Sequence, residues 1–217
     1  MIVGAVLCPA APLLIRGVAD GAAARCAELV AAALAAAGEL RQRADRVLLV
    51  TATPHSSLTV TVPPDLGPPP FGRGPSRIGG WPNAGWVARE LVGDVPLSAV
   101  GIAADDLPLA DVRTTGRTGV LVLADGAICH GPAAPAAQDE RAAGFERSLH
   151  RALADPDLQA LASWSADNGN LGAELSATAP QALTVLAQLA SAKTWLATAD
   201  YFGAPFGVGY HVATWWS

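Results

Sequence analysis

The sequence predicts a single α/β domain over residues 1–217, in which helices cover both faces of a central, mostly parallel sheet. Two observations predict this three-layer α/β/α class. Segments 2–7, 18–40 and 46–53 form a strand–helix–strand unit, and the right-handed crossover of such a unit makes its strands parallel. The 217 residues are also 51% hydrophobic and only 15% charged, which supplies enough apolar material for a buried core.

Local signals justify the first three elements. Segment 2–7 is short and apolar, and Pro9 and Pro12 end it in a rigid loop. Alanines favour the helix at 18–40, and 46–53 is again a continuous apolar strand. Open α/β sheets carry their chemistry in the loops after their parallel strands, so a site is expected at the loop that follows segment 2–7.

The rest of the chain is divided by its proline and glycine residues. Segment 54–82 predicts a long loop with one short strand at 58–62, and loops of this length are often functional. The turn at 203–207 predicts a C-terminal antiparallel hairpin. The elements predicted after residue 80 are helices at 81–92, 139–153, 157–164 and 173–190 (with Pro180 as a kink or a helix start), and strands at 97–102, 119–123, 195–202 and 208–216.

Charge and composition exclude several classes of partner. The net charge is −5 and the 14 Lys and Arg residues are scattered, so no nucleic-acid surface is expected. No apolar run of about 18 residues predicts a membrane span, and the N-terminus lacks the basic start of a signal peptide, which makes the cytoplasm the expected location. Cys8, Cys26 and Cys129 show no Cys-x-x-Cys spacing, so reduced thiols are expected.

Two histidines follow predicted parallel strands. His55 comes directly after the second strand behind Pro54, and neutral imidazole is the commonest protein metal ligand; the alternative is a loop histidine bonded to backbone. His130 lies in the loop that begins at Asp125, where a side chain titrating near pH 7 suits a general base; the alternative is an ordinary surface loop. Cys129 as a nucleophile is a third interpretation, although adjacent residues seldom aim at each other.

Three further residues have weaker signals. Glu174 is expected near the start of the helix at 173–190, where it is either a ligand or a residue that favours the helix dipole. His211 shares one strand face with Ala213 and Trp215, and it is interpreted as a partly buried structural histidine with a secondary role as a substitute ligand. His150 is expected on the solvent face of the helix at 139–153.

Four segments resemble the class III extradiol ring-cleaving dioxygenase-like superfamily, which includes LigB-type and Memo-like proteins. They are Cys8-Pro9 with Pro12-Leu13-Leu14, Pro54-His55, Asp125-Gly126, and the stretch 203–210, which resembles actinobacterial members. The resemblance spans nearly the whole chain. It implies a LigB-like fold, a small aromatic diol as substrate and a homodimer.

The resemblance also implies a metal centre. Family proteins hold ferrous iron or another divalent metal through two histidines and one carboxylate, and a neighbouring histidine deprotonates the bound catechol. Here His55 and Glu174 are the implied metal ligands and His130 the implied base. The position of the other family histidine is Ala10, whose methyl group binds no metal. Cys8 could supply a thiolate in its place, but is expected to point into the sheet core.

Two functions of different classes follow. The first is an oxidoreductase of the extradiol dioxygenase type with an altered or degenerate metal site; the retention of His55 and His130 favours it. The second is a non-catalytic small-molecule-binding or assembly protein on the same scaffold, which Ala10 favours. A cysteine-dependent hydrolase using Cys129 is a distant third.

Overall fold

The computed structural model describes residues 1–18, 23–52, 58–66, 84–102, 116–190 and 194–217. The strands are β1 (Ile2–Cys8), β2 (Arg46–Ala52), β3 (Leu58–Val62), β4 (Leu97–Ile102), β5 (Thr118–Leu123), β6 (Leu196–Gly203) and β7 (Tyr210–Trp216). The helices are the short 3₁₀ helix η1 (Pro12–Leu14), α1 (Ala23–Arg43), α2 (Ala84–Val92), α3 (Ala142–Leu153), α4 (Leu158–Glu174) and α5 (Ala179–Ala190).

The described strands form one mixed sheet of seven in the order β3-β4-β2-β5-β1-β7-β6. The four central strands run parallel, as the strand–helix–strand pattern predicts. The antiparallel strands lie outside them, with β3 beside β4 on one edge and the pair β7–β6 beyond β1 on the other. The predicted C-terminal hairpin is therefore confirmed.

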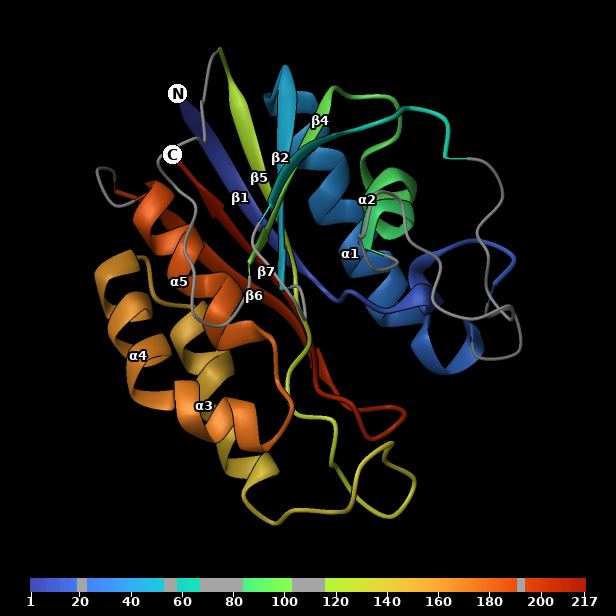
Figure 1. The fold of residues 1–217 in the computed structure, drawn as a ribbon, viewed down its shortest axis with the longest axis vertical. Helices are drawn as coiled ribbons and strands as arrows, with labels where there is room; N and C mark the ends of the chain where they lie inside the picture. Colours follow the sequence, from blue (N-terminus) through green and yellow to red (C-terminus); the bar gives the residue numbers. More distant parts are fainter. Residues whose placement is uncertain (19–22, 53–57, 67–83, 103–115, 191–193) are drawn as a thin grey trace.

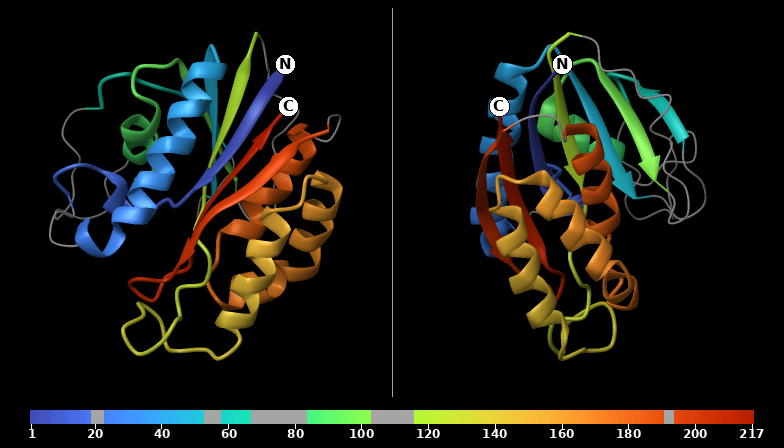
Figure 2. Two further views of the ribbon diagram at one scale, coloured as in Figure 1. Left: turned by 180° about the vertical axis from the view of Figure 1, so that it is seen from behind. Right: turned by 90° about the vertical axis from the view of Figure 1, so that its left-hand side faces the viewer.

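Helices cover both faces of this sheet (Figures 1 and 2). Helices α1 and α2 pack on one face, and α3, α4 and α5 pack on the other, so the predicted three layers are confirmed. A buried apolar cluster fills each interface. All six residues of β5 are buried, as expected for a central parallel strand covered on both sides. No helix in the described ranges has the length and apolar character to cross a bilayer.

The carboxyl ends of the parallel strands bring two loops together. Cys8 at the end of β1 pairs with Leu123 at the end of β5, and Thr51 of β2 lies level with Leu123 on the other side. The segments that follow β1 and β5 therefore start side by side. This places Ala10 next to Asp125, and it is the end of the sheet at which ligands bind in open α/β folds.

The region between 157 and 190 differs from the prediction. Asp157 caps the start of the expected short helix 157–164 by accepting the N–H of Gln159 at 2.8 Å. This helix continues as α4 through the polar run after Trp164 to Glu174, because it packs against α5. The next helix begins at Ala179 with Pro180 in its first turn, where proline costs no hydrogen bond. The expected helix start at 173 is thus wrong.

Candidate functional site

The loop after β5 is fastened to the segment before β7. The N–H of Gly126 donates to the carbonyl of Gly209 at 2.8 Å, and the N–H of Gly209 donates to the carbonyl of Ala127 at 2.8 Å. The N–H of His130 donates to the carbonyl of Gly207 at 2.9 Å. These bonds fix the backbone of His130 against the C-terminal hairpin, so this imidazole is built on a rigid support.

Glu146 of α3 lies under this junction and is completely buried. Its Oε1 accepts the N–H of Ala127 at 2.6 Å, and its Oε2 contacts Nε2 of His211. The carboxylate fits because residues 126 and 209 are glycines: a Cβ at either position would overlap its oxygens. A buried carboxylate needs such partners, since an unpaired one would be strongly destabilising.

His130 faces the same carboxylate. Its Nε2 lies 3.5 Å from Oε1 of Glu146, and its side chain is 16% exposed. Nε2 itself is buried and makes no hydrogen bond within the described residues. The imidazole therefore turns one nitrogen into the protein, towards negative charge, while the remainder of the ring keeps access to the surface. A carboxylate that faces one nitrogen of an imidazole favours one orientation and tautomer of the ring, an arrangement that suits a general base.

His211 and His150 extend the cluster along the inner side of the hairpin. His211 is 1% exposed and stacks on Phe202 with ring centroids 4.7 Å apart. It lies on the same face of β7 as Ala213 and Trp215, as predicted, and this face is covered by α3, α4 and α5. His150 is half-buried, and its ring lies 5.9 Å from that of His211, so its expected place on the solvent face is wrong. Burial, with His211 as a second cause, lowers the pKa of His150.

Asp125 joins the loops after β1 and β5. Its Oδ1 accepts the N–H of Ala10 at 3.1 Å, and its own backbone is bonded to Thr178 at the start of α5. Burial raises the pKa of Asp125 to about 6, the Ala10 N–H opposes this shift, and the nearby charge of Glu146 adds to it. Asp125 is thus a second carboxyl group at the same edge of the sheet, and its pKa is raised.

Glu174 lies at the last residue of α4. Its carboxylate binds Nη1 of Arg141 at 2.6 Å, and its side chain is 58% exposed. Arg141 also binds Asp139, and that contact lowers the pKa of Asp139 to about 2. Glu174 therefore belongs to a surface ion-pair network beside the loop after β5, and the structure does not bring it into contact with Glu146 or His130.

The described residues do not fit the predicted metal centre. Ala10 offers only a methyl group, its N–H is already bonded to Asp125, and the carboxylate of Glu174 is held by Arg141. His55 lies outside the described residues. Across the described ranges, no group of three or more His, Cys, Asp or Glu side chains is arranged to hold an ion. The contact of His211 with Glu146 occupies the space that a cation between them would need.

Two cysteines considered from the sequence are core residues. Cys8 is fully buried in the cluster between the sheet and α1, as expected, and burial raises the pKa of its thiol. Cys129 is 3% exposed, and burial also raises the pKa of its thiol. Neither thiol has the low pKa and the access that a nucleophile or a redox-active cysteine needs.

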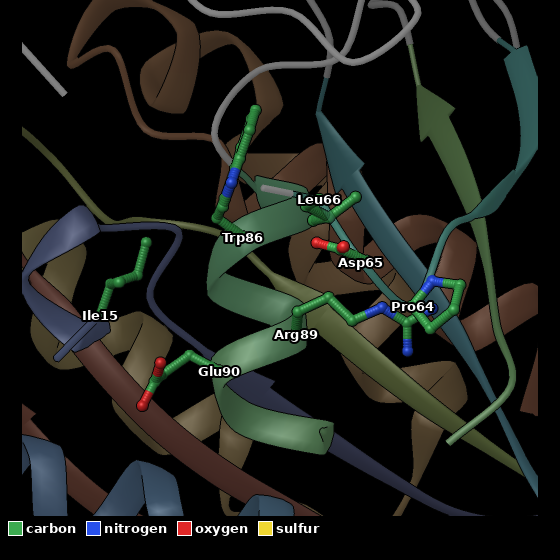
Figure 3. A pocket seen from close by; sticks show the side chains of 7 residues that line it. All are labelled: Ile15, Pro64, Asp65, Leu66, Trp86, Arg89 and Glu90. Carbon is green, nitrogen blue, oxygen red and sulfur yellow. The ribbon is translucent and has the colours of Figure 1, made fainter. Parts of the chain in front are cut away.

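A separate pocket of about 270 Å³ lies between η1, the end of β3 and helix α2 (Figure 3). Its lining residues are Ile15, Pro64, Asp65, Leu66, Trp86, Arg89 and Glu90. The guanidinium of Arg89 donates to four backbone carbonyls, and Glu90 pairs with Arg16 at 2.7 Å. Arg89 thus holds the end of β3 against α2, and Glu90 holds the segment after η1 against the same helix, so we interpret this pocket as a structural junction.

The sequence predicts His130 and the loop that begins at Asp125, but it indicates neither the carboxyl group of Asp125 nor Glu146 as part of the site. A signal is present, because Glu146 interrupts the apolar stripe of α3 formed by Ala142, Phe145 and Leu149. A charged residue on a buried helix face needs a partner, and two glycines and two histidines elsewhere supply the space and the contacts.

No protein-family model and no curated protein sequence matches this chain.

Proposed function

We propose that this chain is a class III extradiol dioxygenase-like protein with an altered metal site, and that it binds a small aromatic diol beside His130. The observation that carries the proposal is the contact between His130 and Glu146. A partly exposed imidazole that faces a fully buried carboxylate is suited to take a proton from a bound hydroxyl. The three-layer fold and the place of His130 at the carboxyl edge support a LigB-like arrangement.

The step proposed for this site is a proton transfer. One O–H bond of the diol breaks, its proton moves to the imidazole of His130, and the diol remains bound as a phenolate. Glu146 stabilises the positive charge that forms on the ring. The carboxyl group of Asp125, at its junction with Ala10, lies at the same edge and is available to orient the second hydroxyl.

The proposal is tested with 4-nitrocatechol, a diol whose ionised form absorbs at longer wavelength than its neutral form. We expect a saturable shift to longer wavelength on adding protein, at a pH where the free probe is neutral. The shift should be lost in His130→Gln and kept in His150→Gln, a histidine whose ring lies against His211 and Phe202 instead. An equal shift in wild type and His130→Gln, or no shift in wild type, would contradict the proposal.

A second candidate is a non-catalytic binding or assembly protein on the same scaffold. The bond between the Ala10 N–H and Asp125 favours it, because a structural contact stands where the resemblance implies a metal ligand. An anaerobic ferrous-iron titration, followed by oxygen uptake with catechols, separates the two. Tight one-to-one binding that disappears in His55→Ala would favour the oxidoreductase, whereas no saturable binding would leave ring cleavage without its metal.

A further inference from the structure

The carboxylate of Glu146 is shared between two imidazoles, and this arrangement has a consequence for His130. We infer that Glu146, held by His211, is a positioning residue that keeps the proton of neutral His130 on Nε2. The Nδ1 atom of His130 is then the nitrogen that accepts a proton. This inference rests on the proposed function, because it names the atom of His130 that meets the diol.

The contacts of Glu146 define which groups donate. Oε1 accepts the N–H of Ala127 at 2.6 Å and Oε2 contacts Nε2 of His211. Because Oε1 accepts the N–H of Ala127, it presents lone pairs to its neighbours, and such an oxygen favours a hydrogen on a nitrogen that faces it. The same rule applies to Nε2 of His130 at 3.5 Å from Oε1: an N–H there is attracted to the carboxylate, and a lone pair is repelled.

The position of the His130 ring leaves one nitrogen for chemistry. Nε2 is buried, whereas the side chain as a whole is 16% exposed. Proton exchange with a ligand must therefore occur on the other side of the ring, at Nδ1. The backbone N–H of His130 is bonded to the carbonyl of Gly207, which holds the backbone of His130 in place beside Glu146.

His211 has a supporting role. It is 1% exposed and is fixed by its place on β7 and by stacking on Phe202. Its Nε2 contacts Oε2 of Glu146, so Oε1 stays directed at Ala127 and His130. Gly126 and Gly209 leave room for the carboxylate, since a Cβ at either would overlap its oxygens. The contacts with Ala127 and His211 hold the carboxylate in this space.

The tautomer of His130 is measured directly by long-range ¹H–¹⁵N correlation spectra of ¹⁵N-labelled protein. The chain has four histidines, so His130→Gln identifies the signals. In the wild type we expect the pattern of the Nε2–H tautomer at neutral to mildly alkaline pH. The Nδ1–H tautomer in the wild type would overturn the inference without any variant at Glu146.

Glu146→Gln keeps the shape of the side chain and removes its charge. We expect His130 to become a mixture of tautomers, and the affinity for 4-nitrocatechol to fall by about tenfold or more. Glu140→Gln, a loss of the same charge at an exposed position nearby, should change neither readout. His211→Gln serves as the second variant, and it should disturb the His130 tautomer in the same direction.

The two proposals fail in different ways. An unchanged Nε2–H tautomer in folded Glu146→Gln and His211→Gln would overturn the positioning role, even if the probe binds to the wild type. A tautomer that depends on Glu146, together with no spectral shift of 4-nitrocatechol in the wild type, would leave the positioning role intact and contradict the proposed function.

Discussion

Gly209 and Glu146 touch so closely that a Cβ at position 209 would overlap Oε1 of the carboxylate, which would then have to move. This contact joins the start of β7 to helix α3 and fixes how near they can approach. The glycine in the C-terminal segment is therefore required by a residue more than sixty positions earlier in the chain.

Gly209→Ala should destabilise the protein. The added methyl must displace a buried carboxylate and its bonds to Ala127 and His211, and overpacking of this kind costs about 1–3 kcal/mol. Gly144→Ala is the control, because a methyl group added at this position of α3 meets open space and should be stabilising by about 0.5–1 kcal/mol. Urea unfolding should therefore show a lower free energy of unfolding for Gly209→Ala and a higher one for Gly144→Ala. Equal changes in the two variants would contradict the close contact.

Asp125→Asn should change how stability depends on pH. Burial raises the pKa of Asp125 to about 6 from an ordinary value of 3.8, so the folded state holds this proton more tightly. Stability should fall as pH rises from about 4 to about 6, by at most ~3 kcal/mol, and then level off. The variant cannot ionise there and should lack this loss, while its amide oxygen still accepts the Ala10 N–H.

Asp139→Asn is the matched control for Asp125→Asn. Arg141 lowers the pKa of Asp139 to about 2, so the stabilisation it brings is complete above about pH 4 and disappears only as the pH falls further. Between pH 4 and pH 8 the free energy of unfolding of Asp139→Asn should therefore change with pH in parallel with that of the wild type. If the free energy of unfolding of Asp125→Asn also runs parallel to that of the wild type, the pKa of Asp125 is not raised in the folded protein.

Glu174→Gln tests the predicted metal ligand. The ion pair with Arg141 is largely exposed, and such pairs contribute about 0–1 kcal/mol, so thermal unfolding should change little and the change should shrink at high salt. Any ferrous binding should be the same in the wild type and the variant, because the carboxylate of Glu174 is paired with Arg141. Loss of a tight one-to-one site in Glu174→Gln alone would show that the carboxylate leaves Arg141 to bind metal.

The cysteines should be unreactive in the folded protein. Cys8 and Cys129 are buried, and burial raises the pKa of both thiols, so alkylation by iodoacetamide near pH 7 should be about tenfold or more slower than that of free cysteine. Unfolding in urea should restore the normal rate. Rapid alkylation of native Cys129 would revive the cysteine-dependent hydrolase.

Local patterns are sufficient to predict the layers and the order of the elements. Apolar runs such as 46–53 and the glycine turn at 203–207 are decided by neighbours in sequence, and the corresponding strands and hairpin are present. The polar run after Trp164 departs from its local pattern because packing of α4 against α5 overrides the low helix propensity of Asn168 and Gly169.

The candidate site is harder to predict because its contacts are remote in sequence. His130 can be found from its place after a strand. Its partner Glu146 depends on glycines at 126 and 209, and no local pattern relates these three positions. The place of Glu174 escapes prediction for the same reason, since its role is decided by Arg141 on another element.

Strand β7 lies inside the sheet, between β1 and β6, and Val6 of β1 pairs with Thr214 of β7. The pairing of β1 with β7 joins the first strand of the chain to the last. Contacts between such distant residues form late, because chain entropy must be lost before they contribute stability. A nascent chain can therefore collapse its parallel strands before His211 reaches Glu146. We expect refolding to show collapse in a fast phase, and the burial of Trp215 on β7 together with completion of the His130 environment in a slower one.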